Sequence, residues 1–252
     1  MSYPLYIFFG VLPSFIWLLF YLRKDSHPES NRMVLKIFFY GMVMALPAIL
    51  LEMGILKVLG ELKLPLILLT FLSIFIGIAL VEEVLKYLVV KEKVLDHPEF
   101  DEPVDVMLYI IIAALGFAAA ENILILFSLG PTFLFGNVFT ISVLRFWGAT
   151  FLHALCSGVL GYFLALSIFE TTSQRDKSLF HLRFLRKLDK RGRLLIGGVG
   201  IATFLHGLYN FSIMELEGIL SWLIPIVILI SLAIFLAFAF KRLKKLKSVC
   251  KI

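Results

Sequence analysis

Cysteine is scarce in this 252-residue chain, which contains Cys156 and Cys250 and no others. One lies inside a long apolar run and the other in a basic tail, so the sequence indicates no disulfide framework of the kind that stabilises small secreted domains. The chain also lacks the H-E-x-x-H pattern of a zinc site built on one helix and the G-x-S-x-G pattern of a serine nucleophile. These absences exclude several familiar kinds of hydrolase site.

Aspartate is missing from the interior of the long apolar runs. The six aspartates lie in polar segments or at the ends of those runs: Asp25, Asp96, Asp101, Asp105, Asp176 and Asp189. A pair of aspartates deep in a membrane, of the kind that aspartic proteases use, therefore has no residues here. Glutamate and histidine are therefore the residues that could carry out acid–base chemistry inside the apolar runs.

Long apolar runs dominate the composition. Hydrophobic residues make up 60% of the chain, against roughly 45–50% in soluble proteins, and the mean hydropathy is +0.97. Seven runs can cross a hydrocarbon core about 30 Å thick: residues 3–22, 34–56, 64–90, 104–129, 138–169, 194–213 and 219–240. Membrane strands would alternate over about 10 residues instead. We predict an all-α fold, a polytopic membrane helix bundle of seven transmembrane helices in a single membrane-embedded domain, residues 1–252.

The distribution of Lys and Arg predicts the orientation of this bundle. Basic residues gather after the first, third, fifth and seventh spans, whereas the opposite side holds Lys57 and Lys63. By the positive-inside rule, the N-terminus is outside and the C-terminus is cytosolic. The first run has no basic start and no small-residue cleavage site, so we expect a retained span. The net charge of +6 then reflects topology and indicates no nucleic-acid partner. We expect a multi-pass protein of the cell membrane, in contact with the lipid bilayer.

Residues 178–191, between the fifth and sixth spans, have an amphipathic pattern. Apolar side chains can form one helical stripe against basic ones, namely Phe180, Phe184, Leu185 and Leu188 against Arg183, Arg186, Lys187 and Lys190. Such a segment lies along the cytosolic lipid surface. The alternative is a solvated basic loop.

Two adjacent glutamates, Glu82 and Glu83, lie with Lys86 in the third apolar run. A charge near the middle of a membrane helix costs on the order of 2.5–3.5 kcal/mol, so such residues usually face a bundle interior and are functional. Lys86 follows the glutamates by four and three positions and can neutralise either. Neighbours on a helix point about 100° apart, so one carboxylate can face a cavity while the other contacts a structural partner. The alternative is a charged cluster at the cytosolic interface.

His153 lies among small residues in the fifth run. Ala154 with Gly158, and Ser157 with Gly161, have the small-x-x-x-small spacing that allows helices to approach closely. Close packing there would carry the imidazole into the bundle.

Further polar residues lie in the fourth, fifth and sixth runs. His206 and Asn210 are four positions apart and share one helix face. Glu121 and Asn122 follow a stretch of small residues, and Arg145 could balance a carboxylate or hold a substrate carbonyl. The alternative for Arg145, near the outer end of its span, is a side chain that extends to the membrane interface. We expect these residues to meet the paired glutamates in one buried polar site.

Two chemistries fit this set. Glu121, His153 and His206 are a ligand set that Zn²⁺ accepts in hydrolases, with water in the open position. Without a metal, Glu82 or Glu83 could act as the base. The two histidines and Asn210 would then stabilise an oxyanion. The residues alone leave both open.

The depths of the glutamates constrain this site. At 1.5 Å per residue, Glu82 falls toward the cytosolic half of the membrane and Glu121 nearer the outer half. One compact site therefore requires either tilted helices or span ends that differ from those predicted.

The sequence resembles the PrsW family of intramembrane proteases at several ordered places. These are Glu82-Glu83-Val84-Leu85-Lys86, Asp101-Glu102-Pro103-Val104-Asp105, Gly116-Phe117-Ala118-Ala119-Ala120-Glu121-Asn122, His153 and His206-Gly207-Leu208-Tyr209-Asn210-Phe211. The resemblance implies that the catalytic residues are Glu82, Glu83, Glu121, His153, His206 and Asn210. Relatives that process CAAX-tagged proteins use a similar arrangement.

We therefore expect an intramembrane endopeptidase that cleaves membrane-anchored protein substrates. Its catalytic core would cover residues 64–213, with Lys86, Asn122 and Arg145 in supporting roles. One alternative is a CAAX-type prenyl-protein endopeptidase. Another is an ion or proton-coupled transporter, because buried Glu, His and Lys also build relays.

Overall fold

The computed structural model describes residues 3–25, 27–97, 100–130, 135–169 and 190–246. These residues form helices and no strands, and seven of the helical segments are long and apolar enough to cross a membrane. The predicted all-α membrane bundle with seven spans is thus confirmed. Its predicted orientation stays a prediction.

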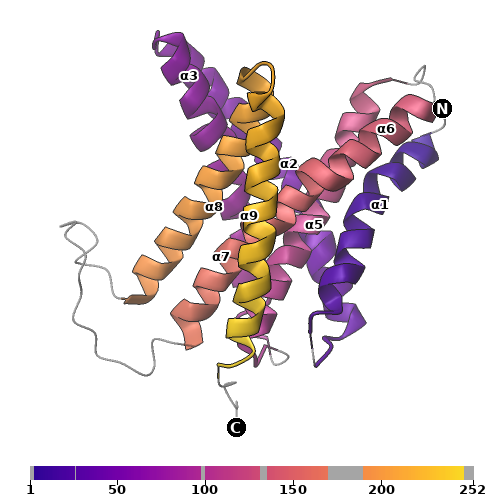
Figure 1. Cartoon of the computed structure of the whole chain (residues 1–252), viewed down its shortest axis with the longest axis vertical. Coiled ribbons are helices and arrows are strands. Elements are labelled where there is room, and N and C mark those ends of the chain that lie inside the picture. The colour runs from indigo at the N-terminus through magenta and orange to yellow at the C-terminus, as the bar shows by residue number, and fades with distance from the viewer. Residues whose placement is uncertain (1–2, 26, 98–99, 131–134, 170–189, 247–252) are drawn as a thin grey trace.

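Five spans are single helices and two are composite (Figure 1). The single helices are α1 (Tyr3–Leu22), α2 (Asn31–Glu61), α5 (Pro103–Ser128), α8 (Lys190–Glu215) and α9 (Leu220–Leu243). The third span joins α3 (Leu66–Leu72), the π-helix η1 (Ser73–Leu80) and α4 (Val81–Lys93). The fifth span joins α6 (Phe135–Arg145), the π-helix η2 (Phe146–Thr150) and α7 (Phe151–Phe169). The amphipathic segment predicted at 178–191 lies outside the described residues up to position 189, and its last two residues begin α8.

The helix α5 lies at the centre of the bundle. Every residue from Val106 to Leu115 is fully buried. This helix packs against α1, α2, α4 and α7, so its apolar side chains contact protein and not lipid. Many large apolar side chains on the other helices are exposed, as a bilayer requires. In Figure 1 the helices diverge toward the end that holds the N-terminus, with α3, α8 and α9 on one side and α1 and α6 on the other.

The start of α5 explains the acidic motif at 101–105. Pro103 opens the helix, where its missing N–H costs no hydrogen bond. The Asp105 carboxylate accepts hydrogen bonds from the backbone N–H groups of Glu102, at 2.6 Å, and Asp101, at 3.2 Å. The bond from the Glu102 N–H belongs to a capping box between Glu102 and Asp105 that fixes where the central helix begins.

The segment between α1 and α2 docks on this end of α5. The Tyr109 hydroxyl donates a hydrogen bond to Glu29 Oε2 at 2.6 Å. Burial at this contact, together with the nearby charge of Asp105, raises the pKa of Glu29 to about 8. The connection between the first two spans is thereby tied to the central helix on the predicted cytosolic side.

Two glycines allow the backbones of α2 and α5 to touch. A Cβ atom on Gly116 would lie 1.9 Å from the carbonyl oxygen of Phe38, and one on Gly41 would lie 2.0 Å from that of Ala113. Both contacts are with backbone atoms, which cannot rotate away as a flexible side chain can. This crossing positions the half of α5 that carries Glu121.

Substitution of Gly116 by Val should destabilise the fold. Overpacking costs about 1–3 kcal/mol or more, because side chains and backbone must shift. A matched control is Gly54→Val in α2, where nothing lies within 4 Å of the added Cβ. Thermal unfolding in detergent should show a clear loss for Gly116→Val and little change for Gly54→Val. Equal melting temperatures would contradict the close crossing.

The close packing expected around His153 is also present. A Cβ atom on Gly158 would lie 2.6 Å from the Leu236 side chain of α9, and one on Gly161 would lie 2.7 Å from Cα of Met107 in α5. These contacts hold α7 between α5 and α9, and His153 is accordingly buried, with 2% of its surface exposed.

Candidate active site

Glu82, Glu83 and Lys86 lie in the first two turns of α4, directly after the π-helix η1. All three are buried, and Glu83 and Lys86 are completely so. Lys86 Nζ donates to Glu82 Oε2 at 3.0 Å and to Glu83 Oε1 at 2.9 Å. The single ammonium group therefore bridges both carboxylates and balances one of their two negative charges, and the cluster is buried inside the bundle.

His153, near the start of α7, contacts a different residue through each ring nitrogen. Its Nδ1 lies 2.8 Å from Lys86 Nζ and 3.6 Å from Glu82 Oε2. Its Nε2 lies 2.8 Å from Glu121 Oε2. A carboxylate can only accept, so Nε2–H is the donor in that pair, which leaves the lone pair of Nδ1 directed at Glu82 and Lys86.

His206, in α8, has a parallel arrangement. Its Nδ1 lies 3.0 Å from Glu83 Oε1, and its Nε2 lies 3.9 Å from Glu82 Oε2. Ser157 Oγ donates to the other oxygen of Glu83 at 2.8 Å. Glu83 is thus the structural partner of His206, whereas Glu82 faces both imidazole rings.

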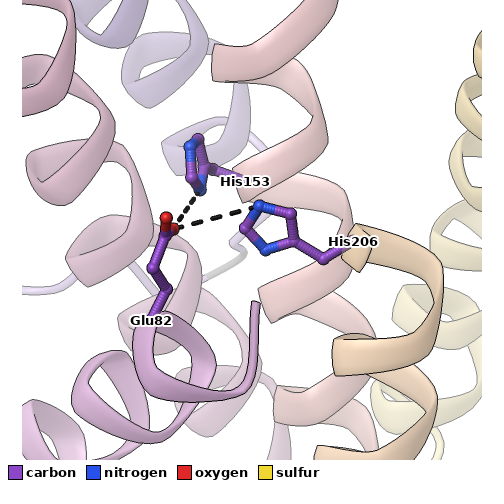
Figure 2. A group of neighbouring side chains, drawn as sticks. All are labelled: Glu82, His153 and His206. Atoms are coloured by element: carbon purple, nitrogen blue, oxygen red, sulfur yellow. Dashed lines mark ion pairs between the residues drawn. The ribbon is translucent and has the colours of Figure 1, made fainter. Parts of the chain in front are cut away.

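Glu82, His153 and His206 form the central group of the site (Figure 2). One ligand atom from each lies within 4.8 Å of the others, and together they could hold a metal ion. The sequence predicted the two histidines with Glu121 as metal ligands. In the structure Glu121 contacts the far nitrogen of His153, and Glu82 is the carboxylate that lies between the two rings.

A second polar network places Glu121. Arg145 Nη2 lies 3.0 Å from Glu121 Oε2, and Arg145 Nε donates a short hydrogen bond to Asn122 Oδ1. The Asn122 amide group in turn donates to Thr150 Oγ1 at 3.0 Å and to the Gly10 carbonyl at 3.2 Å. These contacts join α5 to the composite fifth span and hold Glu121 against His153. Glu82 and Glu121 thus meet at one imidazole, that of His153, despite the different depths that their positions in the apolar runs predicted.

The central group opens on a cavity of about 800 Å³. Its walls are mainly apolar and come from α2, α5, α8, α9 and the two composite spans. Polar residues on the wall are Glu52, Glu82, Glu121, Arg145, His153, His206, Tyr209, Asn210 and Ser221. The size is within the range of ligand-binding cavities, roughly 300–1,000 Å³.

Two of these wall residues bear directly on the sequence predictions. Asn210 lines the same cavity as His206, one helical turn away, as their spacing predicted. Glu52, in α2, was not among the predicted site residues. The available signal was a lone acidic residue inside the second apolar run, which is costly in a membrane and usually functional.

The charge of the cluster also favours a bound cation. Three carboxylates, Glu82, Glu83 and Glu121, face two permanent cations, Lys86 and Arg145, which leaves one negative charge when both histidines are neutral. Each histidine has one nitrogen bound to a carboxylate and the other facing Glu82. Such carboxylate–histidine pairs are typical of metal sites, where they orient the ring. The residues present therefore fit a metal, with Lys86 competing for the same lone pair of His153.

A buried acid–base cluster on the wall of a cavity inside a membrane bundle is the arrangement of a membrane-embedded enzyme. The family model described as "PrsW family intramembrane metalloprotease" matches residues 29–239. The chain therefore belongs to the PrsW family of intramembrane metalloproteases. It is a multi-pass membrane protease, whose substrates are embedded in the bilayer.

Three curated relatives agree with this family. The chain is 29% identical to "Protease PrsW" of Geobacillus kaustophilus, over 82% of this chain and 79% of the relative. It is 28% identical to that of Oceanobacillus iheyensis, over 88% of each, and 26% identical to that of Bacillus subtilis, over 95% of this chain and 94% of the relative. No solved structure matches the chain significantly. The predicted endopeptidase is thus confirmed, which disfavours the transporter alternative.

Proposed function

We propose that this protein is a zinc-dependent endopeptidase of the cell membrane in which Glu82, His153 and His206 hold the metal. The observation that carries the proposal is the convergence of these three side chains on the wall of the membrane-buried cavity. Two nitrogens and one carboxylate oxygen are a ligand set of catalytic zinc sites. A zinc ion there would supply Lewis-acid polarisation of the scissile carbonyl and of a nucleophilic water.

The remaining residues of the cluster would orient the ligands. Glu83 and Glu121 accept from the outer nitrogens of His206 and His153 and so fix which nitrogen of each ring carries the proton. Lys86 would keep its contact with Glu83 and release the lone pair of His153. Arg145 holds Glu121 from the other side.

Glu82 and Asn210 would act on the substrate. The contacts of Glu82 with Lys86, His153 and His206 are all made by Oε2. We therefore assign to Oε1 the acceptance of a proton from the attacking water. Asn210 lines the cavity one turn from His206, where its amide N–H can donate to the developing oxyanion.

The cavity favours a single-span membrane protein as substrate. It reaches from the central group to the residues that join α8 and α9, at the end of the bundle away from the C-terminus. A peptide bond inside a helix is hydrogen-bonded and shielded, so the substrate segment must unwind to be cut. The polar wall residues can receive the backbone groups that unwinding frees.

Cleavage of single-span reporters by purified protein in detergent tests this function. We expect cutting that a zinc chelator lowers at least a hundredfold and that added Zn²⁺ restores, because the ligand set loses its metal. Full activity in metal-free protein would contradict the zinc assignment and favour water activated by Glu82 alone. Preference for a farnesylated CAAX peptide over an unlipidated span would instead support the prenyl-protein endopeptidase.

A further inference from the structure

A second cavity, of about 380 Å³, lies between α1 and α9 at their predicted cytosolic ends. It is separate from the active-site cavity and shares no wall residue with it. The residues that line it are aromatic, aliphatic or basic: Trp17, Phe20, Tyr21, Lys24, Phe151, Ala233, Leu236, Ala237, Phe240, Lys241 and Lys244. Its two halves therefore differ sharply in polarity.

The deep half is apolar and well packed. Trp17 stacks on Phe151 with ring centroids 4.1 Å apart, and Tyr21 stacks on Phe240 at 6.2 Å. The indole N–H of Trp17 donates to the carbonyl oxygen of Phe146 at 2.9 Å. Because that N–H is already bonded, the ring presents only hydrocarbon to the cavity. Such a wall suits an acyl chain.

The mouth of the cavity carries three lysines. Lys241 and Lys244 are three positions apart at the end of α9 and lie on one face. Lys24 lies two residues beyond the end of α1, with its ammonium group 4.5 Å from the centre of the Phe20 ring. All three are exposed, and no carboxylate is among the residues that line the cavity in the described part of the chain. The positive charge at the mouth therefore has no anion in the cavity wall.

We propose that this cavity binds an anionic phospholipid of the inner leaflet. Its phosphate would lie among the three lysines, and one acyl chain would lie against Trp17, Tyr21 and Phe240. Basic pockets between membrane helices on the cytosolic side suit anionic headgroups, and the positive-inside rule places these lysines at that level. A zwitterionic lipid offers the same acyl chain without net negative charge, so it would bind more weakly.

Trp17 is a built-in reporter of this site. The chain has three tryptophans, and the other two, Trp147 and Trp222, line the active-site cavity. In a background with Trp147→Phe and Trp222→Phe, fluorescence comes from Trp17 alone. Quenching by dibrominated phosphatidylglycerol in mixed micelles then measures occupancy, with dibrominated phosphatidylcholine as the neutral comparison.

We expect half-maximal quenching at a phosphatidylglycerol content at least tenfold below that for phosphatidylcholine. Replacing Lys24, Lys241 and Lys244 by Gln should raise the phosphatidylglycerol value at least tenfold. A matched control replaces Lys36, Lys91 and Lys93 by Gln, which removes the same charge elsewhere on the predicted cytosolic side and should change it less than twofold. Ala237→Trp places a large side chain in the cavity and should prevent phosphatidylglycerol from binding. Because the added tryptophan would fluoresce itself, bound lipid is measured for this variant by native mass spectrometry.

Several outcomes would overturn the proposal. Equal quenching by the two lipids would show that the lysines select nothing. Equal loss in the two triple variants would reduce the effect to overall surface charge. Displacement of the brominated lipid by free glycerol phosphate at similar concentration would indicate a site for a soluble phosphate and not for a lipid.

Discussion

Glu82→Gln should abolish proteolysis without unfolding the protein. We expect turnover of a single-span reporter to fall at least a thousandfold, since loss of a general acid–base group alone costs roughly 10²–10⁴. Gln has nearly the same shape, and its carbonyl oxygen can still accept from Lys86. What it lacks is the charge between the two imidazole rings and the ability to take a proton from water.

The same helix supplies the control for this experiment. Glu92, also in α4, has 62% of its side chain exposed and lies outside the cavity walls. Glu92→Gln should cleave at the wild-type rate. The measurement is turnover by each purified variant, with thermal unfolding as the check on folding. Activity of Glu82→Gln within tenfold of wild type would exclude Glu82 as a catalytic residue.

Lys86→Met should have the largest effect on stability. Lys86 is fully buried and contacts Glu82, Glu83 and His153. Met fills a similar volume but leaves two buried carboxylates without their cation. Breaking a buried ion pair by removing one partner costs about 3–5 kcal/mol. We expect the free energy of unfolding to fall by that order, as measured by steric trapping in bicelles.

Two further variants make this prediction specific. Lys91→Met removes the same charge from an exposed position of α4, where the ion pair to Glu92 spans 3.7 Å, and should change stability little. Adding Glu83→Gln to Lys86→Met should recover part of the loss, because one unpaired carboxylate is then gone. Equal stability of Lys86→Met and Lys91→Met would show that the buried cluster does not need its lysine.

The spans were predictable because a bilayer imposes length and apolarity on each. The spacing of Glu82, Glu83 and Lys86 likewise predicted their contacts, since residues three and four apart on a helix are neighbours. The π-helices were not predictable. η1 and η2 end just before the glutamates and just before His153, and the extra residue per turn changes which face the following side chains present.

Which residues form the site was easier to predict from the sequence than which of them contact each other. The same polar residues were expected to meet, yet which carboxylate lies between the histidines depends on helix tilt and rotation, and these are set by packing. The backbone contacts at Gly41 and Gly116 are part of that packing. Glu52 reaches the cavity from α2. The residues three and four positions before and after it are all apolar, so the sequence did not pair it with another polar residue.

Zinc affinity of purified variants distinguishes Glu82 from Glu121 as the carboxylate ligand of the metal. The geometry predicts one zinc per wild-type chain, loss of binding in Glu82→Gln and His206→Ala, and retained stoichiometry in Glu121→Gln with affinity lowered about 10–100-fold, as for a residue that orients a ligand. Isothermal titration of the metal-free proteins gives both quantities without reference to activity. Loss of zinc in Glu121→Gln together with full binding in Glu82→Gln would contradict this assignment and make Glu121, His153 and His206 the metal site.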